Sequence, residues 1–365
     1  MSQFPRVAVV ILNYNGLQNN YLPDFLPSVY ASTYPNMVLY VADNASTDGS
    51  VAYLQQEGFI PLEEAEQQAT YGNKYLIALP ENYWFAGGYN RALKQVQADY
   101  YILLNSDVKV SPNWIEPMVE LLEKDPQIAA CQPKIRLEAE PYLFEHAGAA
   151  GGYLDCWGYP FCRGRIFNNL EEDRGQHDTD QEIFWASGAA LFIRAACFHS
   201  FGGFDEDFDA HMEEIDLCWR LKRGNYKIAV CTSSVVWHVG GGTLPKSNPH
   251  KTYLNFRNSL GMVYNNETPE RLHKVIWMRL LLDGVAGARF LFQGEFKNIW
   301  AIVKAHWHYF AHFKKRRQKR ALIASIVEEQ AYQGQAQFRP AGRYEKSIVW
   351  AHFVEGKQVF GELEI

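Results

Sequence analysis

Short polar residues follow each of four apolar runs in the first 110 residues of the chain. These polar groups are Asn13-Tyr14-Asn15, Asp43-Asn44, Glu81-Asn82 and Asn105-Ser106-Asp107. Asn and Asp are common in turns, which would explain any one of the four groups. Four in succession favour another interpretation, because α/β sheets bind ligands at the carboxyl ends of their strands. The pattern therefore predicts a polar binding crevice.

Several carboxylates and one histidine stand at predicted element ends and could carry chemistry. They are Asp43, Asp107, Glu213, Glu214, Asp216 and His238. Such groups suit a hard divalent cation, Mg²⁺ or Mn²⁺, which commonly binds through one or two carboxylates plus substrate phosphates. A nucleotide diphosphate fits that combination. Gly87 and Gly88, placed before a predicted helix, would let the backbone approach an anion and donate to it.

Strands and helices alternate among the elements that must position these residues. Apolar strands are expected at 7–12, 37–44, 75–80 and 100–105, and helices at 22–32, 46–56 and from 87. Ser46 and Thr47 are the expected N-cap residues of the second helix. The alternation predicts right-handed βαβ units and a doubly wound sheet. Strand patterns return at 190–198 and 227–239, whereas loops and short strands are expected between 135 and 180.

The acidic segment after residue 204 leads into a predicted helix. Helical spacing links Glu214, Leu217, Cys218 and Leu221. Asp216 lies two positions beyond Glu214 and therefore faces away from it, so we expect it to pair with Arg220 four residues later. Gly224 is the expected end of the helix.

From residue 252 to about 330 the sequence favours amphipathic helices rich in aromatic residues. Charged residues interrupt them, and no run reaches the roughly 18 apolar residues that a membrane span needs. Lys314–Arg320 holds six basic residues among seven, and such runs are most often solvated. Beside aromatic helices the run is also a candidate for contact with anionic phospholipid headgroups. The same helices could pair with a second copy as a homodimer.

The overall composition is ordinary for a globular protein. The 365 residues are 47% hydrophobic and carry a net charge of -6, which gives no indication of a nucleic-acid partner. No CxxC pair occurs among the six cysteines, so we expect small core thiols in a reducing compartment and no zinc site. The first residues lack the features of a signal peptide. We therefore expect a cytoplasmic protein that contacts the inner face of the membrane peripherally.

Seven segments occur in an order and spacing that carry a family resemblance. They are VVILNYNG, VADNASTDGS, ENYWFAGGYNRAL, ILLNSDV, WASGAALFIR, FDEDFDAHMEEIDLCWRLKRGNYKI and VWHVGGGT. The set, which spans roughly residues 5 to 265, resembles family 2 glycosyltransferases with the GT-A fold. It is most similar to the bacterial rhamnosyltransferase-like branch, which acts on cell-surface polysaccharides. The resemblance implies a GT-A domain with a mixed, doubly wound sheet at 1–245 and a helical extension at 246–365.

This resemblance implies roles for the matching residues. The nucleotide pocket would contain Asn13, Asn15, Asp43, Asn44, Gly88, Asn90 and Asn105, with Asp43 holding the base. Asp107 matches the last position of the family's DXD-type metal motif, and His238 matches a histidine that approaches the metal or the diphosphate. Ser187 and Gly188 match the segment near the sugar and the acceptor. Asp205, Asp207 and Asp209 form an acidic loop that is either solvated or helps to place the acceptor.

The resemblance also implies an inverting transfer of a sugar, rhamnose among the candidates, from a nucleotide diphosphate sugar to a hydroxyl of a glycan or lipid-linked acceptor. A carboxylate then takes the hydroxyl proton. Family members usually carry Glu-Asp at the start of the helix, and the Asp is the base. Here the pair is Glu213-Glu214, so Glu214 is the leading base and Glu213 the rival. The added methylene moves the carboxylate by about 1 Å, enough to matter for positioned catalysis.

Two other classes of protein fit part of this pattern. A nucleotide-sugar-binding protein without catalysis would explain the Glu-for-Asp change at Glu214. A nucleotidyltransferase also combines an α/β sheet with metal-binding carboxylates. It would need a glycine-rich, basic phosphate loop after the first strand, and NYNGLQNN contains no Lys or Arg.

Overall fold

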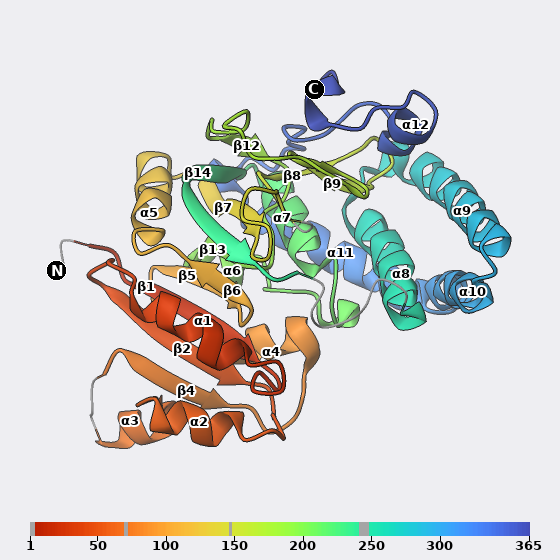
Figure 1. Cartoon of the computed structure of the whole chain (residues 1–365). Coiled ribbons are helices and arrows are strands. Elements are labelled where there is room, and N and C mark those ends of the chain that lie inside the picture. Colours follow the sequence, from red (N-terminus) through yellow and green to blue (C-terminus); the bar gives the residue numbers. More distant parts are fainter. Residues whose placement is uncertain (1–3, 69–71, 146–147, 241–247) are drawn as a thin grey trace.

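The computed structural model of the protein describes residues 4–68, 72–145, 148–240 and 248–365. A mixed sheet in the order β12-β14-β7-β13-β5-β1-β2-β4-β3, with β6 added to β14, forms its centre (Figure 1). The strands are β1 (Val7–Asn13), β2 (Met37–Asp43), β3 (Ile60–Pro61), β4 (Lys74–Ala78), β5 (Tyr100–Asn105), β6 (Val108–Val110), β7 (Ile128–Leu137), β12 (Gln181–Ile183), β13 (Ala190–Arg194) and β14 (Lys227–His238).

Strand β1 shows how this sheet separates two cores. Ala8 and Val10 join one buried cluster and Val9 and Ile11 the other, because successive side chains of a strand point to opposite faces. Helices cover both faces, which explains why the strands are continuously apolar. These helices are α1 (Tyr21–Tyr30), α2 (Ser50–Gln56), α3 (Leu62–Gln68), α4 (Trp84–Leu93), α5 (Ile115–Lys124), α6 (Ala195–Ser200) and α7 (Glu213–Arg223).

Strand pairing brings the polar strand ends together. β1 runs parallel to β2 and β5, in a register that places Asn13 opposite Asp43 and Leu12 opposite Asn105. β13 is antiparallel to both β5 and β7. The sheet is therefore mixed, as predicted.

Two predicted helix starts differ from the structure. α2 begins at Ser50 and Gly49 occupies its N-cap position, so the prediction that Ser46 and Thr47 cap this helix is wrong. α4 begins at Trp84, three residues before Gly87, so the two glycines lie within the helix. By contrast, α1 buries the four apolar residues whose spacing predicts it, Leu22, Phe25, Leu26 and Val29.

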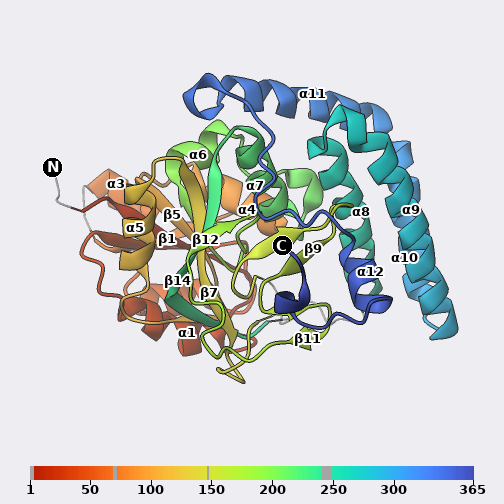
Figure 2. The same cartoon turned by 90° about the horizontal axis from the view of Figure 1, so that it is seen from above.

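A small second sheet and the end of the chain pack beside the main sheet (Figure 2). This sheet contains β8 (Gly152–Leu154), β9 (Pro160–Cys162), β10 (Arg165–Ile166) and β11 (Asn169–Leu170). Isolated bridges pair Leu154 with Arg343 and Gly224 with Gln337. Asp155 Oδ2 accepts a hydrogen bond at 3.0 Å from the backbone of Ile348, at the start of α12 (Ile348–Phe353). The last residues therefore form a docked tail.

Four long helices precede this tail in the described part of the C-terminal extension. They are α8 (Pro249–Asn266), α9 (Pro269–Phe292), α10 (Phe296–Ala311) and α11 (Phe313–Glu329). α8 packs against α7, and α10 packs against α8, so α9 and α10 lie at the outer edge of the molecule (Figures 1 and 2). Within the described ranges, no helix has the length and apolar character needed to cross a bilayer. All six cysteines are free thiols.

Candidate active site

The ends of β1 and β2 form a hydrogen-bonded cluster around Asp43. Asn13 Nδ2 donates to Asp43 Oδ1 at 2.8 Å and to Ser46 Oγ at 3.0 Å, and the Ser46 amide donates to Asp43 Oδ2 at 2.9 Å. The Asn15 amide donates to Ser46 Oγ at 2.9 Å, and Asn15 Oδ1 accepts from the Thr47 amide at 2.7 Å. Asn13 and Asp43 are buried and shape this turn, whereas Asn15 and Ser46 are half-buried. The sequence did not predict that Ser46 would bond to Asn13, Asn15 and Asp43 and so connect them.

Asn44 holds the turn that starts α4. Its Nδ2 donates to Asn82 Oδ1 at 2.9 Å and to the carbonyl of Trp84 at 3.0 Å, while its Oδ1 accepts from the Tyr83 amide at 3.0 Å. The side chain is buried. Its hydrogen bonds therefore link β2 to α4 across the predicted nucleotide pocket.

Gly88 and Asn90 lie inside α4 and pack it against its neighbours. A Cβ at Gly88 would lie 2.8 Å from Leu12 Cδ1, so this glycine lets α4 approach β1 closely. Asn90 Nδ2 donates to the carbonyl of Phe204 at 2.9 Å, and Asn90 Oδ1 accepts from the Phe204 amide at 3.0 Å. The expectation that Gly87 and Gly88 precede a helix is wrong, because the helix already starts at Trp84.

Asp107 and His238, the predicted metal ligands, lie together. His238 Nε2 is 3.2 Å from Asp107 Oδ1 and 3.5 Å from Asn105 Nδ2, and His238 Nδ1 is 3.4 Å from Glu145 Oε1. Burial by itself lowers the pKa of His238, but the two carboxylates more than offset this effect and raise the pKa to about 10. Sequence reasoning missed Glu145. The neighbouring His146, which the sequence favours as an ordinary polar histidine and not a ligand, lies outside the described residues.

The chemistry of this group fits a cation that shares its ligands with a substrate. In the described part of the chain, no group of three or more His, Cys, Asp or Glu side chains is arranged to hold a metal ion. Asp107 could supply one ligand, and His238 a second once a bound cation displaces the proton that the neighbouring carboxylates stabilise. The rest would come from diphosphate oxygens or water. Mg²⁺ commonly binds in this way, through few protein groups and several phosphate or water oxygens.

Gly188 lies beside the first turn of α7. A Cβ at Gly188 would be 3.7 Å from Glu214 Cβ and 3.3 Å from the Phe85 ring. Ser187 is buried, and its amide donates to Gln132 Oε1 at 2.9 Å. Ser187 therefore fixes the turn, and Gly188 is the member of the predicted pair that leaves room next to Glu214.

Glu213 and Glu214 are the first two residues of α7. Each has a buried Oε2 atom without a hydrogen-bond partner among the described residues. Burial raises the pKa of Glu214 to about 7. Burial and the charge of Glu214 raise the pKa of Glu213 well above its usual range. A carboxylate that titrates near neutral pH is suited to accept a proton from a hydroxyl. Asp216 pairs instead with Arg220 Nε at 2.8 Å, as predicted.

The loop before α7 has an unusual backbone that α8 holds in place. Asp209, His211 and Met212 have φ values of 59°, 70° and 76°, a region that costs energy for residues other than glycine. Asn258 Nδ2, whose two hydrogens are shared among three carbonyls of this loop, lies 2.7 Å from that of Phe208, 2.8 Å from that of Ala210 and 2.9 Å from that of His211. Asn258 is 1% exposed, so these bonds are shielded from water.

Arg257 of α8 and the start of α4 also bind this loop. We call the contacts of Asn258 and Arg257 with the loop the clasp. Arg257 Nη2 donates to Asp209 Oδ2 at 2.9 Å and to the carbonyl of Phe208 at 3.0 Å. From the opposite side, the amides of Phe85 and Ala86 donate to the carbonyl of Asp209 at 3.1 and 3.2 Å. Sequence reasoning missed the roles of Arg257 and Asn258, because no local pattern links α8 to a loop so far away in the chain.

Much of the basic run Lys314–Arg320 is used inside the molecule. Lys315 Nζ lies 2.8 Å from Asp207 Oδ1, and Lys319 forms ion pairs with both Asp205 and Asp207. Arg320 donates to the carbonyls of Tyr264 and Glu267. These ion pairs therefore hold the acidic loop before α7 against α11. Because several cations of the basic run have partners inside the molecule, fewer are left to contact lipid headgroups than the sequence alone predicts.

Comparisons with known proteins agree with the resemblance. The model of "Glycosyl transferase family 2" matches residues 8–198, slightly more than half of the chain. The N-acetylglucosaminyl-diphospho-decaprenol L-rhamnosyltransferase of Mycobacterium tuberculosis is 25% identical over 240 residues, which cover 61% of this chain and 73% of that protein. The low-salt glycan biosynthesis hexosyltransferase Agl10 of Haloferax volcanii is 19% identical over 302 residues, which cover 80% and 87%.

A solved structure supports the fold. GalNAc-T7, crystallised with UDP, GalNAc and Mn²⁺, matches 72% of this chain with a TM-score of 0.52 and 15% sequence identity. The chain spans about half of that protein, 48% of its length. The central mixed sheet is thus that of the GT-A fold, as predicted. The chain belongs to glycosyl transferase family 2.

Proposed function

We propose that the protein moves a sugar, with inversion, from a nucleotide diphosphate sugar to a hydroxyl of a glycan or lipid-linked acceptor. One observation carries the proposal: Glu214 lies in the first turn of α7 beside Gly188, and burial raises its pKa to about 7. Family membership supplies the reaction class. The relative from M. tuberculosis is named for rhamnose transfer to a diphospho-decaprenol sugar, so rhamnose and a polyprenyl-diphosphate acceptor are the first candidates.

In the proposed reaction, the acceptor oxygen attacks the anomeric carbon as the bond from that carbon to the diphosphate breaks. The acceptor proton passes to the Glu214 carboxylate, and the electron pair of the broken bond stays on the nucleotide diphosphate. Attack opposite the leaving group inverts the anomeric centre. Glu213, which is buried at the same helix start, is the alternative base.

We assign the donor to the ends of β1, β2 and β5. Asn15 and the turn around Asp43 would contact the nucleotide, and Asp107 with His238 would hold a divalent ion against the diphosphate. A bound divalent ion stabilises the negative charge that grows on the departing diphosphate. The presence of Mn²⁺ in the GalNAc-T7 structure supports a divalent ion for this fold, and both Mg²⁺ and Mn²⁺ suit this donor set.

We place the reaction in cell-surface polysaccharide synthesis, on the cytoplasmic face of a membrane. The support is the printed function of relatives, among them an O-antigen biosynthesis protein of Myxococcus xanthus. A homodimer through the C-terminal helices is an alternative arrangement that the oligomeric state in solution would test. No comparison supports the alternative of a binding protein without catalysis.

The test is release of nucleotide diphosphate from a panel of nucleotide sugars with Mg²⁺, Mn²⁺ or EDTA, with and without polyprenyl-diphosphate-linked acceptors. We expect metal-dependent release that a matching acceptor accelerates, and a product of inverted anomeric configuration. Tight donor binding without turnover across the whole panel would favour the binding protein instead. A product of retained configuration would remove the proposed single-displacement step.

A further inference from the structure

Helix α10 exposes a continuous apolar stripe. Phe296, Trp300, Val303, Trp307 and Phe310 recur every three or four residues and therefore share one face of the helix. Their exposed fractions are 66%, 68%, 48%, 67% and 56%. The opposite face, with Ala301, Ala305 and Tyr309, is buried. The stripe is thus additional to the apolar face that packs α10 into the protein.

Helix α9 carries a similar stripe. Trp277, Leu281, Val285 and Phe292 are exposed by 68%, 64%, 64% and 90%. α9 contacts α10, and the pair lies at the outer edge of the molecule in both views (Figures 1 and 2). We call the two stripes together the α9–α10 face. Isolated exposed apolar residues are normal, but contiguous apolar surface of this kind marks a binding surface.

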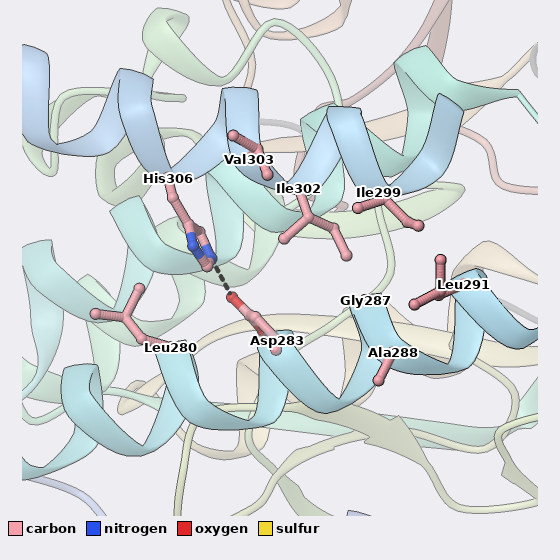
Figure 3. Close-up of a pocket in the computed structure, with 10 residues that line it drawn as sticks. Leu280, Asp283, Gly287, Ala288, Leu291, Ile299, Ile302, Val303 and His306 are labelled. Atoms are coloured by element: carbon pink, nitrogen blue, oxygen red, sulfur yellow. Dashed lines mark hydrogen bonds and ion pairs between the residues drawn. The ribbon is translucent and has the colours of Figure 1, made fainter. Parts of the chain in front are cut away.

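A groove runs between the two helices (Figure 3). It has a volume of about 390 Å³, and Gly284, Gly287 and Ala288 of α9 leave room for it opposite Ile299 and Val303 of α10. At one position His306 Nε2 meets Asp283 Oδ2 at 2.9 Å, and the Tyr159 hydroxyl donates to Asp283 Oδ1 at 3.2 Å. Both carboxylate oxygens of Asp283 therefore have hydrogen-bond partners, and the rest of the groove lining is mainly aliphatic. Its size and character suit a hydrocarbon chain.

The charge around the α9–α10 face is opposite to that of the whole chain. Residues 269–320 contain twelve Lys and Arg but three Asp and Glu, although the chain carries a net charge of -6. Lys297 and Lys304 are exposed on α10, three and four residues from Trp300. Lys314 and Arg317 are exposed at the start of α11. Tryptophan next to lysine is typical of the interface between water and an anionic lipid bilayer.

These observations favour a membrane over a second copy as the occupant. In a symmetric dimer the same face of each subunit would meet, so that the lysines of one α10 would lie near those of the other. We propose that the α9–α10 face docks on an anionic lipid bilayer, with its tryptophans at headgroup depth and the groove open to a lipid chain. The helices lie along the surface rather than cross it.

The docked face leads toward the candidate active site. The Trp84 ring at the start of α4 lies 6.3 Å from His250, His250 stacks on Tyr253 at 6.1 Å, and Lys304 Nζ lies 5.0 Å from the Tyr253 ring. α4 also contacts the loop before the catalytic carboxylates. This route would bring a lipid-linked acceptor headgroup to the site, an extension that rests on the proposed function. Docking itself can be tested without sugar transfer.

Sedimentation with vesicles tests the proposal on the full chain. Wild-type protein is mixed with phosphatidylcholine vesicles with or without phosphatidylglycerol, and compared with Trp300→Ala/Trp307→Ala and Lys297→Gln/Lys304→Gln. We expect binding to anionic vesicles to weaken by about tenfold or more in the tryptophan variant. The lysine variant should show a smaller preference for anionic over neutral vesicles than wild type does, because Lys314 and Arg317 remain exposed. The control is Tyr142→Ala/Leu322→Ala, which removes two exposed apolar side chains outside the face and should bind as wild type does.

Wild-type binding by the tryptophan variant, with an unchanged circular dichroism spectrum, would overturn the proposal. So would a wild-type dimer that the tryptophan substitutions convert to monomer while vesicle binding is retained, as sedimentation velocity would show. Transfer to a water-soluble acceptor separates the two proposals. Vesicle binding without any transfer would contradict the proposed function and support docking, whereas transfer without vesicle binding would do the reverse.

Discussion

Glu214 stands where the resemblance to the family implies an aspartate, and its side chain is one methylene longer. Gly188 leaves space beside the Glu214 Cβ, and the preceding backbone turns sharply at Met212. Each additional carbon moves a carboxylate by about 1 Å, a shift that matters for a proton transfer between positioned groups. Glu214→Asp should therefore reduce the transfer rate by about tenfold to a hundredfold, which a nucleotide-release assay would measure. Wild-type rates in this variant would show that the base position tolerates either length.

Glu213 offers a test that separates stability from catalysis. Its pKa is raised in the folded protein, so the folded state holds a proton that the unfolded state loses, and stability falls as pH rises from about 4.5 through the folded pKa. Glu213→Gln removes this cost and should raise the free energy of unfolding at pH 8 by about 1 kcal/mol or more, with little change at pH 4. Urea unfolding at both pH values measures it.

The same variant should keep sugar transfer within about threefold of wild type if Glu214 is the base. Loss of transfer by more than a hundredfold, together with normal stability, would instead identify Glu213 as the base.

Asp107 provides the carboxylate of the proposed metal site. Asp107→Ala should weaken nucleotide diphosphate binding in Mn²⁺ by about tenfold or more, and bring it close to the affinity measured in EDTA, because one of two protein ligands is lost. Isothermal titration calorimetry with and without Mn²⁺ checks this. Glu120→Ala, on the exposed side of α5, is the control. Metal-dependent binding that stays unchanged in Asp107→Ala would remove this residue from the site.

At the level of elements, the clasp from α8 connects the C-terminal helices to the loop before Glu213 and Glu214. Asn258→Ala would remove a buried donor from the carbonyls of Ala210 and His211, whereas the Phe208 carbonyl keeps its bond from Arg257. Loss of such buried bonds costs about 1 to 3 kcal/mol. We expect kcat to fall by about tenfold or more while KM for the donor changes little, because the loop orients the base and not the nucleotide. Steady-state kinetics with varied donor measure both.

Asn265→Ala is the matched control for the clasp. Asn265 is buried on the same helix but donates toward Asp205 and Asp216 at 3.4 and 3.5 Å instead of toward the loop carbonyls. It should lose stability without the same loss of kcat. Equal losses of kcat in both variants would show that the clasp has no specific role in positioning.

Elements with regular local spacing could be predicted from the sequence, and elements stabilised by distant contacts could not. The four apolar residues of α1 predict its buried face directly. β7, by contrast, contains Gln132 and Lys134, two polar residues that interrupt an apolar run. Both are buried, because Gln132 accepts from Ser187 and Lys134 pairs with Asp173. Their partners lie far away in the chain, so the sequence gives no sign that these two polar residues are buried in a strand.

The residues of the candidate site differ in the same way in how far the sequence predicts them. Asp107 and His238 were predicted together through the family motifs, and the structure brings them to 3.2 Å. Glu145, on the other side of His238, could not be predicted, because it lies in a segment without periodicity. Gly88 and Asn90 match family motifs, yet their observed contacts are with β1 and with the loop at Phe204.

For the whole molecule, the described residues from 248 onward pack against the part of the chain that holds the candidate site. α8 holds the loop before α7, α11 pairs with the acidic loop, and the tail adds bridges to the second sheet. A fragment ending at residue 245 would expose these surfaces and leave the backbone of the 209–212 loop unsupported. We expect it to lack a cooperative thermal transition, as circular dichroism would show. A soluble, cooperatively folded fragment that transfers sugar would contradict this view of the molecule.

The measurement that tests the central claim most directly is the pH dependence of kcat/KM for sugar transfer in wild type and Glu214→Gln. The wild-type value should rise with pH through about 7, because the carboxylate must lose its proton before it can act as a base. Glu214→Gln should lose about a hundredfold to ten-thousandfold in rate and this rise, while it binds nucleotide as wild type does. A Glu214→Gln variant with the wild-type rate and pH profile would contradict the account.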